Sequence, residues 1–317
     1  MSNKMINRRS IYLTDNIIIH LDKIINREPS PSYMGTLIKD TIEIPVIIKI
    51  LSTVDLMGNN INYTREINIA EGIINNPHKN IIKVYDVIKQ TNKIYIVTEY
   101  CHDGDMSTIL FNPLKEDIAK YYFYQIASGI RYMKDNNIIH RDIKPKNIML
   151  SDNRLTLKLA DFGFAKIQES KMVKSTSICG SPLYMAPEIL NINVYSDSVD
   201  IWALGIIMYE MLFGSHPFES CKDYEELRRM AKTTINIPNS VNISHEALEL
   251  LKKLLSVNSS RIDIDDVLLD EWLSDIKTPE YISLKNMYYK NSSLNTYRKN
   301  EHTNIDSDDN IFIFTME

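Results

Sequence analysis

The sequence predicts an α+β protein with two lobes: a small N-terminal lobe of antiparallel sheet plus one helix, and a larger, mostly helical C-terminal lobe. Three observations predict this class. Short runs rich in Ile and Val, separated by turn residues, fill residues 11–97. Beyond Asp105 the apolar residues recur at helical spacing. The chain also has 317 residues, enough for two compact lobes.

The N-terminal lobe is expected to cover about residues 11–100. Five apolar runs read as strands, at 17–25, 32–38, 46–51, 81–88 and 93–100. Between the third and fourth runs, Ile67, Ile69 and Ile73 recur near helical spacing within residues 62–76, and Pro77 ends the pattern. This lobe is therefore predicted as a sheet with a single helix.

The C-terminal lobe is expected to cover about residues 101–275. Four long periodic stretches predict helices at 116–137, 198–214, 224–232 and 245–256, joined by loops rich in Asp, Ser, Pro and Asn. The periodicity fades after Trp272 and Leu273. We therefore predict a domain at 11–275 and a polar extension at 276–317 outside its core.

Composition and charge exclude several protein classes. The chain has nine glycines, about 3% against ~7% on average, and no two lie closer than nine positions. It thus contains neither a G-x-G-x-x-G loop nor a Walker-type phosphate loop. The net charge of −5, from 36 basic and 41 acidic residues, is the wrong sign for a protein whose main partner is nucleic acid.

The cysteines and the lengths of the apolar runs favour a soluble protein of the reducing cytoplasm. Cys101, Cys179 and Cys221 are odd in number and form no C-x-x-C pattern. The first residues lack the apolar core of a signal peptide, and the apolar runs stop far short of the ~20 residues that span a bilayer. We expect no membrane span, and nothing in the sequence specifies an oligomeric state.

Two polar segments concentrate the residues suited to chemistry. IIHRDIKPKNIML, at residues 138–150, places Asp142, Lys144 and Asn147 within six residues of a loop that Pro145 keeps from becoming helical. Fourteen residues after Asn147, LKLADFGFAK places Asp161 after a short apolar strand. Because an Asp and an Asn can share a hard cation, the pattern suits magnesium bound to phosphates.

These segments resemble the eukaryotic protein kinases. HRDIKPKN at 140–147, DFG at 161–163, APE at 186–188 and VIIK at 46–49 occur in that family's order and spacing. The resemblance covers about residues 11–275, and EYCHDGDM, DFGFAK and CGSPLYMAPEIL are most similar to the autophagy-initiating kinases. It implies a bilobal protein-kinase-like fold, ATP and Mg as cofactors, and Ser/Thr hydroxyls of proteins as acceptors.

The resemblance also implies catalytic roles. Asp142 would accept the proton of the substrate hydroxyl, and Lys144, which marks Ser/Thr rather than Tyr specificity, would stabilise the transferring phosphoryl group. Lys49 would hold the α- and β-phosphates, aimed by a glutamate. Glu66 is preferred to the alternative Glu71 because apolar residues follow Glu66 at +3 and +7, the core-facing offsets of a helix.

Binding and regulatory roles follow from the same resemblance. Asn147 and Asp161 would bind magnesium. The residues expected around ATP are Ile25, Ser32, Lys49, Glu99, Cys101, Asp105 and Met149. Ser181 would brace Asp142, Ser177 would be the activation-loop phosphosite, and Arg141 would bind its phosphate. Glu188 is expected to pair with Arg261, and Asp200 to anchor the catalytic loop.

The roof of the nucleotide site departs from the family pattern. Ile25, Arg27 and Ser30 stand where the family has three glycines, and Ser32 replaces the valine that usually covers adenine. Side chains at these positions hinder the close approach of backbone to phosphate. The alternative to an active kinase is therefore a kinase-fold scaffold that binds nucleotide weakly and acts by binding proteins.

Overall fold

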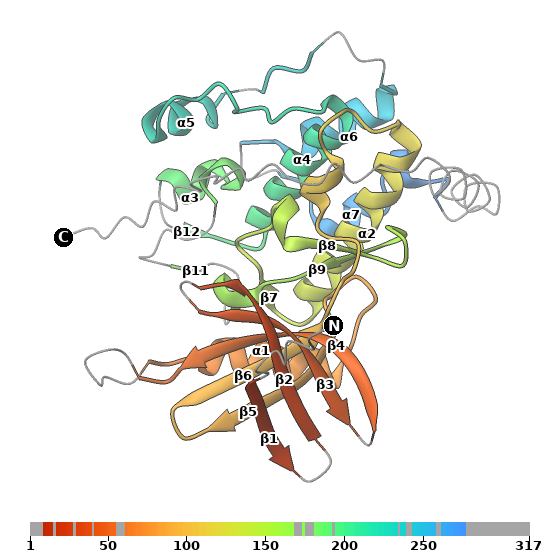
Figure 1. The fold of residues 1–317 in the computed structure, drawn as a ribbon. Helices are drawn as coiled ribbons and strands as arrows, with labels where there is room; N and C mark the ends of the chain where they lie inside the picture. Colours follow the sequence, from red (N-terminus) through yellow and green to blue (C-terminus); the bar gives the residue numbers. More distant parts are fainter. Residues whose placement is uncertain are drawn as a thin grey trace. The chain divides into compact units, whose positions relative to one another are not determined.

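The computed structural model describes residues 9–14, 17–27, 30–39, 41–54, 61–167, 173–174, 181–191, 194–233, 235–238, 243–257 and 261–276. They divide into two compact units, one within Met1–His102 and one within Asp103–Glu317 (Figure 1). The predicted bounds of the domain and its extension stay predictions, and residues 277–317 lie outside the described residues.

The N-terminal unit is an antiparallel sheet of six strands with one helix, in the order β1-β2-β3-β4-β6-β5 (Figure 1). Its elements are β1 (Arg9–Thr14), β2 (Ile17–Asn26), β3 (Ser32–Lys39), β4 (Ile42–Ser52), α1 (Thr64–Asn75), β5 (Val84–Gln90) and β6 (Lys93–Glu99). Helix α1 packs against β5. The five predicted strands and the predicted helix are thus confirmed as β2–β6 and α1.

Alternating side chains of neighbouring strands build the core of this unit. Its buried members are Ile19, Leu21, Leu37, Val46, Ile48, Tyr95 and Val97. Gly35 lets β2 and β3 lie close together at this point, because a Cβ atom there would come within 2.1 Å of the carbonyl oxygen of His20. Strand β1 was not predicted, since RSIYLT is a short, mixed run whose stability depends on pairing with β2.

The C-terminal unit is mostly helical. Its helices are α2 (Glu116–Asp135), α3 (Pro187–Asn191), α4 (Ser198–Phe213), α5 (Tyr224–Met230), α6 (His245–Leu254) and α7 (Ile264–Val267), with the 3-10 turns η1 (Met106–Ile109), η2 (Pro145–Asn147), η3 (Phe162–Phe164), η4 (Pro182–Tyr184) and η5 (Glu271–Leu273). Three two-stranded ladders join β7 (Ile138–Ile139) to β10 (Lys166–Ile167), β8 (Ile148–Ser151) to β9 (Thr156–Leu159), and β11 (Val173–Lys174) to β12 (Val194–Tyr195).

Helix α4 is the central element of this unit. From Val199 to Phe213 every residue except Glu210 is buried, as expected of a helix that is apolar on all sides. It packs against α2 and α6, and it ends at Gly214, whose φ of 70° is the left-handed conformation that glycine adopts without strain. The four predicted helices are confirmed as α2, α4, α5 and α6. Within the described ranges, no helix is both long and apolar enough to cross a bilayer.

Candidate active site

A buried carboxylate on α4 holds the loop that follows β7. Asp200 is 3% exposed and accepts hydrogen bonds from the backbone nitrogens of His140, at 2.7 Å, and Arg141, at 2.9 Å. Burial raises the pKa of Asp200, and these hydrogen bonds oppose that rise. Arg141 has a φ of 69°, which a non-glycine residue rarely adopts. The predicted anchor is confirmed, and it fixes the turn that presents Asp142.

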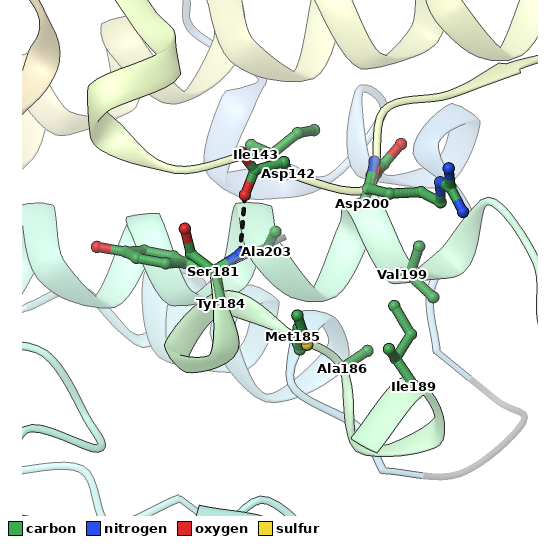
Figure 2. Close-up of a pocket in the computed structure, with 11 residues that line it drawn as sticks. Asp142, Ile143, Ser181, Tyr184, Met185, Ala186, Ile189, Val199, Asp200 and Ala203 are labelled. Atoms are coloured by element: carbon green, nitrogen blue, oxygen red, sulfur yellow. Dashed lines mark hydrogen bonds between the residues drawn. The ribbon is translucent and has the colours of Figure 1, made fainter. Parts of the chain in front are cut away.

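The two carboxylate oxygens of Asp142 have different partners. Oδ1 accepts the backbone N–H of Ser181 at 2.9 Å (Figure 2). Oδ2 accepts Nδ2 of Asn147 at 2.8 Å and lies 3.2 Å from Nζ of Lys144. Asp142 itself is only 4% exposed. A buried carboxylate is thus oriented by a cation and two N–H donors, the arrangement required of a positioned proton acceptor.

Ser181 contacts Asp142 through an atom that the sequence did not predict. The resemblance assigns the brace to the Ser181 hydroxyl, whereas the backbone nitrogen makes the contact. The hydroxyl instead accepts a hydrogen bond of 2.7 Å from Nζ of Lys144. Figure 2 shows the pocket beside Asp142, lined by the catalytic loop, the segment from Ser181 through α3, and α4. Lys144 therefore links the loop to this segment.

Asn147 and Asp161 supply the oxygen donors expected for magnesium. Nδ2 of Asn147 donates hydrogen bonds to the carbonyl and carboxylate oxygens of Asp142. Its Oδ1 is therefore the side-chain atom that can act as a carbonyl ligand. Asp161 is exposed, with a φ of 63°, and accepts the N–H of Gly163 at 3.3 Å. Hard oxygen donors of this kind suit Mg²⁺. Among the described residues no three His, Cys, Asp or Glu side chains gather as a metal site.

Arg141 contacts the backbone just after the predicted magnesium aspartate. Its Nε donates to the carbonyl oxygen of Phe164 at 2.6 Å, and the residue is 9% exposed. It thus ties the catalytic loop to the end of η3. Ser177, the predicted phosphosite, lies outside the described residues.

Asp105 and Met149, predicted beside the nucleotide, lie next to one another in the C-terminal unit. An isolated antiparallel bridge joins their backbones. The Asp105 carboxylate caps η1 by accepting the backbone N–H of Ser107 at 2.9 Å, and it also accepts the Ser107 hydroxyl. The cap fixes the direction of the Asp105 side chain.

In the N-terminal unit Lys49 pairs with Glu66. Nζ of Lys49 lies 2.8 Å from Oε1 of Glu66, and both side chains are largely shielded, at 25% and 13% exposure. Glu71, the alternative partner, forms a more exposed ion pair of 2.7 Å with Lys89. Helix α1 buries Ile69 and Ile73, and this turns Glu66 rather than Glu71 toward β4.

The predicted roof residues lie around the β2–β3 hairpin. Ser32 is the direct cross-strand partner of Lys49, so the two side chains share a face of the sheet. Ile25 is 56% exposed and lies where the β2–β3 register shifts, between Ile24 and Asn26. Farther along the chain, Glu99 accepts the backbone N–H of Lys83 at 2.6 Å and Cys101 is buried. The structure thus groups the predicted site residues into one set in each unit.

Two contacts of the C-terminal unit support the site. The predicted pair of Glu188 and Arg261 is confirmed and is bidentate, with N–O distances of 2.6 and 3.0 Å. The second contact was not predicted: the Tyr184 hydroxyl lies 3.0 Å from both carboxylate oxygens of Glu210. The sequence signal for it was a lone carboxylate, Glu210, within the otherwise apolar run of residues 201–213.

Comparison with known proteins identifies the family. A model of the protein kinase domain matches residues 35–273, and the match begins after the nucleotide roof. The kinase ATG1c of Arabidopsis thaliana is 36% identical over 211 residues, 64% of this chain and 29% of the relative. The KIN12 catalytic subunit of the same plant is 36% identical over 244 residues, 75% of this chain and 48% of the relative.

A human relative has a similar degree of identity. The serine/threonine-protein kinase ULK1 of Homo sapiens is 35% identical over 238 residues, which are 71% of this chain and 22% of the relative. The chain thus spans less than half the length of these curated relatives. Since the domain match covers most of the sequence and includes the whole Asp142 network, this chain belongs to the protein kinase domain family.

Proposed function

We propose that this chain is a serine/threonine protein kinase that transfers the γ-phosphoryl group of ATP to protein hydroxyl groups. The observation that carries the proposal is the buried network of Asp142, Asn147, Lys144 and Ser181. The network orients the Asp142 carboxylate and places the Lys144 ammonium group 3.2 Å from it. Phosphoryl transfer requires both a positioned acceptor group and neutralisation of charge.

Each residue of the network has a distinct chemical task. Asp142 accepts the proton of the attacking hydroxyl, and Lys144 neutralises charge that develops on the transferring phosphoryl group. Lys49, aimed by Glu66, holds the α- and β-phosphates. Magnesium, when bound through Asn147 and Asp161, supplies further charge neutralisation on the phosphate oxygens.

The remaining assignments concern nucleotide, regulation and compartment. Ile25, Ser32, Glu99, Cys101, Asp105 and Met149 are proposed to contact ATP, and phosphate on Ser177 is proposed to engage Arg141 and order the loop up to Ser181. We also propose a cytoplasmic location, which suits the reduced thiols of Cys101 and Cys221.

The direct test is phosphate incorporation by the Asp142→Asn variant. Loss of the proton acceptor should reduce kcat by about 10²–10⁴-fold. Asp152→Asn is the matched control, because Asp152 is an exposed residue with a φ of 56° that asparagine tolerates. Equal phosphate incorporation by the parent, Asp142→Asn and Asp152→Asn would mean that a contaminating kinase transfers the phosphate.

The scaffold alternative is favoured by one observation, the exposed Ile25 at a glycine position of the roof. It predicts that the purified parent protein binds magnesium-ATP weakly and transfers no phosphate. Calorimetric titration of ATP, together with the labelling assay, separates the two functions. Transfer that depends on Asp142 would exclude the scaffold.

A further inference from the structure

Strand β1 changes the position of β2 within the sheet. Arg9–Thr14 pairs antiparallel with Ile17–Leu21, so the first half of β2 is an interior segment. The pairing stops at Leu21. Among the described residues, the second half of β2, residues 22–26, has β3 as its only strand partner. This second half includes Ile25 and precedes Ser32, two residues that are proposed to contact the nucleotide.

Specific contacts fasten β1 to β2. The hydroxyl of Ser10 lies 2.9 Å from Nδ1 of its cross-strand partner His20. Ile11 pairs with the fully buried Ile19 and packs against the core of the N-terminal unit. Figure 1 shows β1 beside β2 at the margin of the sheet. Both a backbone ladder and a core contact therefore hold the strand.

The free half of β2 is irregular. The β2–β3 register shifts twice, between Leu21 and Lys23 and again between Ile24 and Asn26. Such β-bulges leave a residue unpaired, bend the strand and increase its twist. A glycine-rich roof owes its backbone flexibility to the missing Cβ atoms. In this chain the corresponding segment contains bulges instead. Because the bulges weaken the pairing of residues 22–26 with β3, the position of this segment depends on how well residues 17–21 are held in the sheet.

We propose that β1 is a positioning element for the nucleotide: it clamps the base of the β2–β3 hairpin so that the bulged half of β2 keeps its place against β3, the strand whose Ser32 pairs with Lys49. Ser32, at the tip, is the direct cross-strand partner of Lys49, so movement of the hairpin changes the surroundings of the ammonium group. Ser10 and Ile11 are the positioning residues. The inference rests on the proposed function, since it assumes a nucleoside triphosphate under this hairpin.

The test compares Ile11→Ala with Ile44→Ala in the full chain. Both isoleucines are partly buried against the same core, but Ile44 lies on β4 and pairs with Leu37, away from β1. If loosening β1 leaves the roof competent in only a fraction of molecules, the apparent Kd rises by the inverse of that fraction. We expect Ile11→Ala to raise the Kd and KM for magnesium-ATP about three- to tenfold, with kcat within about twofold. In the absence of nucleotide, amide hydrogen exchange in residues 22–26 should be faster in Ile11→Ala than in the parent protein.

Several outcomes decide the matter. Faster exchange with an unchanged Kd, or an equal rise of Kd in Ile44→Ala, would overturn the positioning role and leave the kinase assignment intact. If the parent protein bound no ATP, the proposed function would fail together with the inference. Should Ile11→Ala not fold, Ser10→Ala removes only the bond to His20, and its Kd is expected to rise in the same direction.

Discussion

Glu210 is the one residue between Val199 and Phe213 that is only partly buried, and it forms no ion pair with any described residue. Burial nevertheless raises its pKa from 4.5 to about 7, and the hydrogen bond from Tyr184 opposes that rise. Because the folded-state pKa is the higher one, the protonated acid stabilises the fold. That contribution is complete below about pH 4.5 and is lost as the pH rises through about 7.

We therefore expect Glu210→Gln to flatten the pH dependence of stability. Relative to this variant, the parent should lose roughly 2–3 kcal/mol of unfolding free energy between pH 4.5 and pH 7. Urea unfolding at a series of pH values measures the difference. Tyr184→Phe should shift the transition to higher pH, because it removes the one interaction that lowers the pKa of Glu210. A parallel pair of pH profiles for parent and Glu210→Gln would contradict the assignment.

The two glutamates of α1 provide a matched pair of variants. Glu66→Gln weakens a shielded ion pair with Lys49 and should lower kcat/KM roughly 10–100-fold, the loss expected for a charge-assisted hydrogen bond of about 1.5–3 kcal/mol. Glu71→Gln alters the exposed pair with Lys89 and should change kcat/KM by less than about twofold. Steady-state kinetics on one protein substrate suffices. Equal effects of the two variants would deny Glu66 its positioning role.

At the scale of elements, two glycines of helices have opposite requirements. A Cβ at Gly214 would lie 2.5 Å from Cδ of Pro113, and the φ of 70° strains any other residue. Gly72, within α1, has no heavy atom within 4 Å of such a Cβ. Thermal unfolding should therefore show Gly214→Ala destabilised by more than about 1 kcal/mol, whereas Gly72→Ala should be stabilised by about 0.5–1 kcal/mol. The same sign for both would refute this account.

The sequence predicted those elements whose apolar pattern is long enough to be recognised within the element itself. Helix α4 is apolar throughout and α2 has a clear apolar stripe, so their patterns identify them without tertiary information. Strand β1 could not be predicted in this way, because its six residues of mixed character form a strand only when they pair with β2. The short ladders β7–β10 and β11–β12 have two residues in each strand, too few for any periodicity.

Prediction of the site succeeded within motifs. Between motifs it identified the pairs that the family resemblance implies, such as Glu188 with Arg261, and missed contacts that the resemblance does not specify. Asp142, Lys144 and Asn147 lie within six residues, so one loop already determines their proximity. The choice of the Ser181 backbone nitrogen over its hydroxyl depends on how η4 approaches the loop from 39 residues away. The contact between Tyr184 and Glu210 likewise joins two segments whose patterns carry no information about each other.

At the scale of the whole molecule, the Arg261 guanidinium ties the end of the matched domain to α3 and α4. It is 3% exposed, pairs with Glu188, donates to the Ser198 carbonyl at 2.8 Å and lies 5.2 Å from the centre of the Trp202 ring. Removing one partner of a buried pair leaves an uncompensated charge, which costs more than the pair contributes.

Glu188→Ala should accordingly reduce the free energy of unfolding by about 3 kcal/mol, at the low end of the range for buried pairs because Glu188 is 24% exposed. Glu249→Ala is the control, since the Glu249–Lys252 pair on α6 is exposed and should contribute far less to the free energy of unfolding. Chemical denaturation compares the two. A loss of about 1 kcal/mol or less in Glu188→Ala would show that the cluster tolerates a lone guanidinium.

The partners of Asp142 make its two carboxylate oxygens unequal as acceptors of a further proton donor. A carboxylate has about four lone-pair positions, two on each oxygen. Oδ2 accepts the Asn147 amide and lies 3.2 Å from the Lys144 ammonium, and Oδ1 accepts the Ser181 amide. In the proposed reaction, a hydroxyl that donates its proton while these partners stay in place would approach the position of Oδ1 that the described residues leave open. Under the proposed function, the carboxylate would thereby favour those side-chain rotamers of a serine or threonine acceptor that direct its hydroxyl toward this position.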